Sequence, residues 1–270
     1  MIRIAHEAPL SIMDKVQQVT DYDYALVHLF EENKEYYDFF KQALAKDRYV
    51  ILDNSIFELE EAFDMDKFAQ YVQELKPSAY IVPDALEHCS LTIANFEEWK
   101  KKYDDLPGLK IGVVQGKDLD SILRCYEYMS INADIIAISF DYSFYEEKFP
   151  FEQTKYHSWM KGRQWLLEYM HVRGIIDIDK PHHLLGAGLP QEFAKYKDWE
   201  WIDTIDTSNP VVHGIMNIQY EFEDGLYCLH DKESTKLFTM LEKGVDNWEE
   251  IVYNISKFRH NIKNVDNSFL

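Results

Sequence analysis

The stretch WIDTIDTSNP, residues 201–210, is an apolar run that carries two aspartates and then ends in a turn. The run is typical of a β-strand, and the Ser-Asn-Pro that follows it is typical of a turn. Asp203 and Asp206 lie three positions apart, so in a regular strand their side chains point to opposite faces. Asp206 lies at the strand end and is the candidate for chemistry. Asp203 is predicted to be a structural partner for a helix or loop.

Seven similar apolar runs precede this strand, and amphipathic segments such as 65–76, 92–103 and 119–129 lie between them. The predicted strands are 2–6, 24–29, 49–54, 79–84, 110–115, 134–139, 182–188 and 201–206. Apolar strands that alternate with helices indicate parallel pairing, and eight of them predict a single α/β domain over residues 1–270, a (β/α)8 TIM-type barrel. A doubly wound open sheet is the alternative. Residues 247–265 are predicted to form a closing C-terminal helix with Asn247 as its cap.

Composition limits the class of protein. The chain has 270 residues and a formal net charge of -20, which argues against a basic nucleic-acid surface over the whole molecule but allows a local patch. Its three cysteines form no CxxC pair, so free buried thiols are expected rather than a disulfide framework or a cysteine-rich zinc site. Without a basic leader or a long apolar run, the predicted setting is cytoplasmic, with no membrane partner.

Polar side chains end five of the predicted strands: Asp53, Asp84, Gln115, Ser139 and Asp206. In α/β barrels the carboxyl ends of the strands line the active site. A single acid at such a position can simply cap a loop. Three aspartates and a glutamine together predict a site for acid–base or nucleophilic carboxylate chemistry.

The order and spacing of these segments resemble the tRNA-guanine transglycosylase family, which includes the queuine and archaeosine tRNA-ribosyltransferases. The most specific match is HLLGAGLPQEF followed by WIDTIDTSNP. The family has a similar Gly-x-Gly turn before an Ile-Asp-x-Phe-Asp-x-x-x-Pro strand. The resemblance makes Asp206 the covalent nucleophile, and Leu185 with its neighbour Gly186 the cover on one face of the base.

Upstream segments extend the resemblance over residues 49–210. ILDNSIFE is similar to the family's Asp-Ser-Gly-Gly-aromatic segment, which makes Asp53 the second catalytic carboxylate and Phe57 the stacking aromatic. VPDALEH places Asp84 where the family reads the guanine edge. GVVQGK places Gln115 and Gly116 where the family also contacts the base.

Several positions depart from the family pattern. Ser55-Ile56 replaces a glycine pair, Lys117 replaces a glycine, and Val211-Val212 replaces Thr-Arg. The Cys-x-Cys-x-x-Cys and His zinc subdomain is absent, with Cys228 and His230 as its faint echo, so no metal is predicted. Because that subdomain supports tRNA binding, the shortened relatives that place 7-deazaguanines in DNA, many of them phage-encoded, are the better match.

The resemblance implies a pentosyltransferase that exchanges guanine in DNA, or in tRNA, for a 7-deazaguanine base. No cofactor is expected. The resemblance is compatible with a homodimer, or with a partner subunit that takes the place of the zinc subdomain. If the protein is phage-encoded, it is expected in the host cytoplasm. Two alternatives stay open: an N-glycosidase that acts on a free nucleoside or nucleotide, and a non-catalytic barrel that binds a base or a partner.

Two further segments have two interpretations each. Residues 154–174 contain four cations and one acid, with aromatic residues between them, and so predict either a nucleic-acid surface or an ordinary amphipathic helix with a solvated face. The four cations are Lys155, Lys161, Arg163 and Arg173. Residues 141–153 are too long for a minimal loop, and are expected to form a lid or a packed surface loop.

Overall fold

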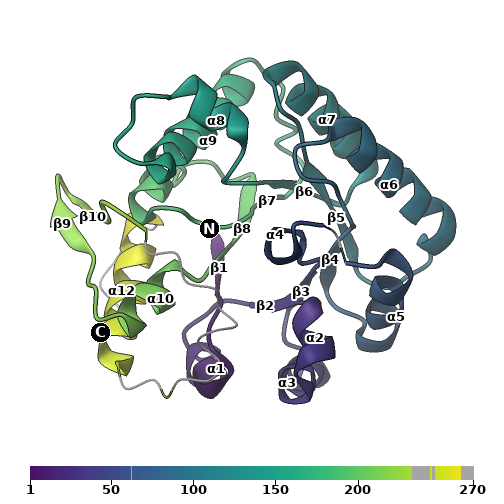
Figure 1. Ribbon diagram of the computed structural model, residues 1–270, viewed down its shortest axis with the longest axis horizontal. Helices are drawn as coiled ribbons and strands as arrows, with labels where there is room; N and C mark the ends of the chain where they lie inside the picture. The colour runs from purple at the N-terminus through teal and green to yellow at the C-terminus, as the bar shows by residue number, and fades with distance from the viewer. Residues whose placement is uncertain (62, 233–243, 245–246, 263–270) are drawn as a thin grey trace. The chain divides into compact units, whose positions relative to one another are not determined.

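Eight parallel strands, joined by helices, form one sheet in the order β1-β8-β7-β6-β5-β4-β3-β2, so the fold is α/β and TIM-barrel-like (Figure 1). The strands are β1 Arg3–His6, β2 Asp23–Leu26, β3 Val50–Asp53, β4 Ala79–Ile81, β5 Leu109–Val114, β6 Ile135–Ile138, β7 His182–Leu184 and β8 Ile202–Thr207. The computed structural model describes residues 1–61, 63–232, 244 and 247–262. The fold class predicted from the eight apolar runs is confirmed.

Helices follow most strands, as the amphipathic segments indicated. They are α1 Met13–Val16, α2 His28–Glu32, α3 Lys34–Ala45, α4 Ile56–Leu59, α5 Met65–Leu75, α6 Cys89–Tyr103, α7 Leu119–Asn132, α8 Ser143–Lys148, α9 Lys155–Val172, α10 Asn209–Ile215 and α12 Trp248–Ile262, with 3-10 helices η1 Leu10–Ile12 and η2 Pro190–Lys195. An antiparallel hairpin, β9 Glu221–Glu223 and β10 Leu226–Cys228, precedes the last helix. Residues 263–265 of the predicted closing helix lie outside the described residues.

Several predicted boundaries differ from the structure. The strands predicted over 79–84 and 182–188, for example, end at Ile81 and Leu184. The run 24–29 ends as a strand at Leu26, because Val27 already has helical backbone angles and α2 begins at His28. The segment 141–153 contains α8 rather than only a loop, and Tyr145 in α8 is fully buried. A packed segment therefore describes this region better than a lid.

The chain divides into two compact units. One consists of Met1–Asp21, Tyr145–Ile178 and Leu184–Leu270, and the other of Tyr22–Phe144 with Asp179–His183. The first, which contains Asp206, is called the nucleophile unit below, and the second, which contains Asp84, the base unit; the names refer only to the roles that the sequence analysis predicts for these two residues. The prediction of a single domain stays a prediction.

In the base unit, aromatic side chains fill the space between the sheet and its helices. The rings of Tyr80 on β4 and Trp99 on α6 have centroids 5.5 Å apart, and Phe68 on α5 lies 5.7 Å from Trp99. The indole nitrogen of Trp99 donates to the hydroxyl of Tyr80 at 3.3 Å. These contacts fix α5 and α6 against β4, the strand that leads to Asp84.

In the nucleophile unit, α10 and α12 lie side by side (Figure 1). Gly214 on α10 makes this approach possible, because a Cβ at that position would be 2.5 Å from the Cα of Ile251 on α12. The same unit pairs β1 with β8, and this register sets Ala5 opposite Asp206. None of the helices among the described residues combines the length and apolar character needed to cross a membrane.

We expect Gly214→Ala to lower the free energy of unfolding by about 1–3 kcal/mol, because the added methyl group has to push α10 and α12 apart. Urea denaturation followed by circular dichroism measures this change. Glu249→Ala, at an exposed position on α12, is the control and should change stability by less than about 0.5 kcal/mol. Equal stability of the Gly214→Ala and control variants would contradict the close contact.

Candidate functional site

The five polar residues predicted at strand ends all lie at or just beyond the carboxyl end of a strand. Asp53 is the last residue of β3, Gln115 follows β5, and Ser139 follows β6. Asp84 comes three residues after β4, and Asp206 is the penultimate residue of β8. Each of these five strands therefore carries a polar side chain at its carboxyl end, the position that the sequence predicted.

Asp84 is the centre of a buried network in the base unit. The side-chain amide of Asn54 donates to Oδ1 of Asp84 at 2.8 Å, and the side-chain amide of Gln115 donates to Oδ2 at 2.7 Å. The amide oxygen of Gln115 in turn accepts from the backbone N–H of Glu87 at 2.8 Å. Asn54, Asp84 and Gln115 are all buried, so the carboxylate is held in one orientation before any ligand arrives.

The pKa of Asp84 is raised above its ordinary value of 3.8, chiefly because burial penalises the charged form. The hydrogen bonds from Asn54 and Gln115 lower the pKa in part, and the charge of Asp141 nearby raises it. A buried acid with a perturbed pKa at a strand end is typical of a functional site.

Asp53 is held by two donors in the same unit. The hydroxyl of Tyr24 on β2 donates to Oδ2, and the backbone N–H of Ser55 donates to Oδ1 at 2.5 Å. Ser55 has a left-handed backbone conformation, with φ of 61°. Because glycine adopts this conformation most easily, the turn after Asp53 retains a glycine-like geometry at the position where Ser55 departs from the family pattern.

The other predicted base contacts have varied surroundings. Phe57 on α4 is 55% exposed as a residue, and the centroid of its ring lies 5.8 Å from that of Phe140. Ser139 donates from Oγ to Asp141 at 2.6 Å. Gly116 packs on the first turn of α7, where a Cβ would be 2.6 Å from the backbone nitrogen of Ile122, so packing alone requires glycine there.

Asp206 is buried in the nucleophile unit, at 5% exposure. Its Oδ1 accepts from the backbone N–H of Gly186 at 3.0 Å. Gly186 lies two residues beyond β7 and has a φ of 65°, so it takes the left-handed conformation that a turn requires. The structure thus joins Asp206 to the Leu185–Gly186 turn, two segments that the sequence had linked only by resemblance.

Asp203 belongs to a different surface of β8. Its carboxylate forms an ion pair with Arg3 on β1, at 2.5 Å, and both side chains are partly exposed. The expectation of a structural role is confirmed, although the partner is a neighbouring strand rather than a helix or loop.

The prediction that Arg163 contacts a nucleic acid is wrong. Its side chain is fully buried and forms an ion pair with Glu192, 2.6 Å away. The charge count of residues 154–174 could not distinguish the inner from the outer face of α9. Lys161 is exposed but pairs with Glu152 at 2.7 Å, whereas Lys155 and Arg173 are exposed beside aromatic rings.

An aromatic–cation strip runs along α8 and α9 and consists of Lys148, Trp165, Tyr169 and Arg173. The rings of Trp165 and Tyr169 are stacked, with centroids 5.1 Å apart and planes at 26°. The ammonium of Lys148 lies 4.0 Å from the centre of the Trp165 ring, and the guanidinium of Arg173 lies 4.5 Å from that of Tyr169. Trp165 and Tyr169 are four residues apart, so they share one face of α9, and Arg173 is the residue that caps the end of this helix.

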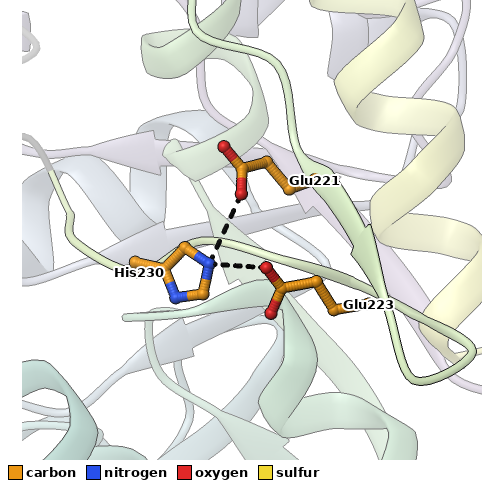
Figure 2. A group of neighbouring side chains, drawn as sticks. All are labelled: Glu221, Glu223 and His230. Carbon is orange, nitrogen blue, oxygen red and sulfur yellow. Dashed lines mark hydrogen bonds and ion pairs between the residues drawn. The ribbon is translucent and has the colours of Figure 1, made fainter.

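Among the described residues, one group brings three metal-ligating atoms within 4.8 Å of one another, namely Glu221, Glu223 and His230. Figure 2 shows both carboxylates directed at the imidazole. Nε2 of His230 lies 2.9 Å from Glu223 and 3.4 Å from Glu221. The hydrogen bond to Glu223 is the main reason that the pKa of His230 is raised. All three side chains are exposed, and their ion pairs alone account for the arrangement.

The cysteines are free thiols. Cys89 and Cys125 are buried, as expected, whereas Cys228 on β10 is partly exposed. Burial is the first reason that the pKa of Cys125 is raised to about 12, so this thiol stays protonated at neutral pH and is not a nucleophile.

Comparison with known proteins gives no match, either to a protein-family model or to a curated protein.

Three residues that the sequence did not single out are partners of the predicted site residues. Asn54 donates to Asp84, Tyr24 donates to Asp53, and Glu192 neutralises Arg163. Asn54 follows Asp53 directly, which is a weak signal for a polar site. Tyr24 and Glu192 gave no signal, because their partners are distant in the sequence.

We expect the stability that Asp84 contributes to fall as pH rises. Its folded-state pKa is raised, so its contribution is fully present below the unfolded-state pKa of about 3.8 and is lost as pH passes through the higher folded-state value. The unfolding free energy of the wild type should therefore fall relative to that of Asp84→Asn as pH rises from about 4 to 7. Urea denaturation of both proteins over this range measures the difference.

Asp118 is the matched control, because hydrogen bonds from Ser121 lower its pKa. The wild type should gain stability over Asp118→Asn as pH rises through the acid range, which is the opposite sign. A pH-independent difference for Asp84→Asn would show that the carboxylate is not desolvated.

Proposed function

We propose that this chain is a guanine transglycosylase that exchanges guanine in a nucleic acid, DNA in preference to tRNA, for a 7-deazaguanine base. The observation that carries the proposal is the buried Asp84 carboxylate, held by Asn54 and Gln115 at the end of β4. A desolvated carboxylate whose orientation is fixed is costly unless it binds something, and the family resemblance assigns it the edge of guanine.

Asp84 suits the guanine edge chemically. Guanine presents N1–H and an exocyclic amine side by side, and a carboxylate accepts both hydrogen bonds. Adenine has an acceptor at N1, so it would face the carboxylate with a lone pair. A 7-deazaguanine keeps the same edge as guanine, which allows one site to bind both the departing and the incoming base.

Asp206 is the proposed nucleophile. One carboxylate oxygen forms a bond to C1′ of the sugar while the C1′–N9 bond breaks, and the electron pair of that bond leaves with guanine. Asp53 donates a proton to the departing base. In the second half of the exchange Asp53 removes the proton from N9 of the 7-deazaguanine, whose nitrogen attacks C1′ and releases Asp206. No electrons are gained or lost, so the exchange needs no cofactor.

Phe57 supports the binding of a flat base, because it is an exposed aromatic residue. Stacking of a base on an aromatic ring contributes roughly 1–3 kcal/mol. Since the target base has to leave its helix to reach such a ring, the substrate nucleotide is single-stranded or flipped out.

The aromatic–cation strip supports a nucleic-acid substrate. It places two exposed cations beside two stacked, half-buried rings in a chain whose net charge is -20. Single-stranded nucleic acids bind to such surfaces through phosphate contacts and base stacking. Of the four cations that the sequence predicted to contact nucleic acid, the strip contains Arg173 but not the buried Arg163.

Asp206→Asn should abolish the covalent adduct that forms between the protein and a guanine-containing oligonucleotide, because an amide is a poor nucleophile. Denaturing gel electrophoresis after incubation with single-stranded DNA measures the adduct. Asp203→Asn is the control, three residues away on the same strand, and should retain the adduct because Asp203 pairs with Arg3.

The same assay with a labelled 7-deazaguanine separates the alternatives. Incorporation of the label supports transglycosylation, whereas release of guanine without incorporation indicates the N-glycosidase. A base that binds to wild type and to Asp206→Asn equally, with no adduct in either, indicates a non-catalytic barrel.

Lys148→Glu with Arg173→Glu should weaken the binding of single-stranded DNA and flatten its salt dependence. Each phosphate contact removed from a single strand lowers the slope of log affinity against log salt by about 0.7. Fluorescence anisotropy at several salt concentrations measures both effects. The control is Lys46→Glu with Lys101→Glu, two exposed lysines of the base unit that change the net charge by the same amount, and an equal loss in the control would show that the effect is only one of net charge.

A further inference from the structure

Arg163 and Glu192 form a fully buried ion pair in the nucleophile unit. The relative exposure of the two side chains is 0% and 1%. Nε of Arg163 donates to Oε1 of Glu192 at 2.6 Å, and one terminal nitrogen donates to Oε2 at 3.1 Å. Tyr196 adds a hydrogen bond to the same carboxylate at 2.7 Å.

Arg163 also holds the turn that follows β7. One terminal nitrogen donates to the carbonyl oxygen of Leu185 at 2.8 Å, and the other donates to the carbonyl oxygen of Gly186 at 2.9 Å. All three guanidinium nitrogens are therefore engaged, two of them on successive peptide groups. A lysine ammonium lacks this planar arrangement of donors.

The turn held by Arg163 is the one that contacts Asp206. The carbonyl of Gly186 accepts from Arg163, while the amide of the same residue donates to Oδ1 of Asp206 at 3.0 Å. At the far end of the turn, Asn209 donates from its side chain to the carbonyl of Gly188 at 2.8 Å. The peptide group between Leu185 and Gly186 is thus held at both ends, its carbonyl by Arg163 and its N–H by Asp206.

We propose that Arg163 is a positioning residue for Asp206, acting through the Leu185–Gly186 turn, and that Glu192 keeps the guanidinium in place for this purpose. Only the catalytic role of Asp206 rests on the proposed function. The link from Arg163 to the Gly186 amide is a property of the structure.

The electrostatics agree with a fixed cation. Burial by itself lowers the pKa of Arg163, but the charge of Glu192 and its hydrogen bonds outweigh burial and the pKa is raised. A buried ion pair contributes little net stability, because desolvation offsets its attraction. Apolar side chains could fill this part of the core instead. Orientation of the Leu185–Gly186 turn therefore gives the Arg163–Glu192 pair a role other than stability.

The test removes both charges together, with Arg163→Met and Glu192→Met, so that no unpaired charge is left in the core. We expect hydrogen–deuterium exchange at the Gly186 amide to become faster, because its neighbouring carbonyl is no longer held. The rate of adduct formation at saturating oligonucleotide should fall on the order of a hundredfold, as a misplaced reacting group does. The oligonucleotide concentration for half-saturation should change little.

Lys195→Met is the matched control. It breaks the exposed ion pair of Lys195 with Glu168, which also joins η2 to α9, and should change neither exchange nor rate. Arg163→Lys is a second variant, which retains the charge but not the planar donors. If the double variant does not fold, the exchange of the Gly186 amide and the adduct rate are measured on Arg163→Lys instead.

Wild-type exchange at Gly186 together with a wild-type adduct rate, in a folded variant, would overturn the inference. If Asp206→Asn leaves the adduct intact, the proposed function fails instead. The exchange measurement still decides whether Arg163 holds the turn, so the two failures can be told apart.

Discussion

Water solvates an ionised side chain far better than a protein interior does, so a buried charge has to be held by hydrogen-bond partners or by an opposite charge. Asp84 is held by two side-chain amides, Asp206 by a backbone amide, and Arg163 by Glu192 and two carbonyls. These partners determine how the strand ends and the turns beyond them are arranged. The candidate sites depend on this constraint.

Pre-organisation follows from the same hydrogen bonds. The Asp84 carboxylate cannot rotate without breaking its bonds to Asn54 and Gln115, so a base that binds to it pays little for ordering the side chain. Asp53 is similarly restrained between Tyr24 and the Ser55 amide. Rigid acids of this kind suit the proposed exchange, in which one site receives two different bases in turn.

Periodicity predicted the eight strands and most helices, because a buried parallel strand has to be apolar along its whole length. It failed where a change of backbone angle, rather than of composition, ends an element, as at Val27. It also failed for Arg163. Four cations near one another suggested a surface, yet a helix turns by a full circle every 3.6 residues and one of the four faced inward.

The sequence by itself determined which side chains follow the strands, since chain order and apolar spacing place Asp53, Asp84 and Asp206 there. It also determined the α/β class, because local apolar patterns decide how strands and helices alternate. Only the tertiary structure decided what holds each acid. Hydrogen bonds such as Gln115 to Asp84 or Arg163 to Gly186 join residues more than twenty positions apart, and no local pattern records which donor folding brings to which acceptor.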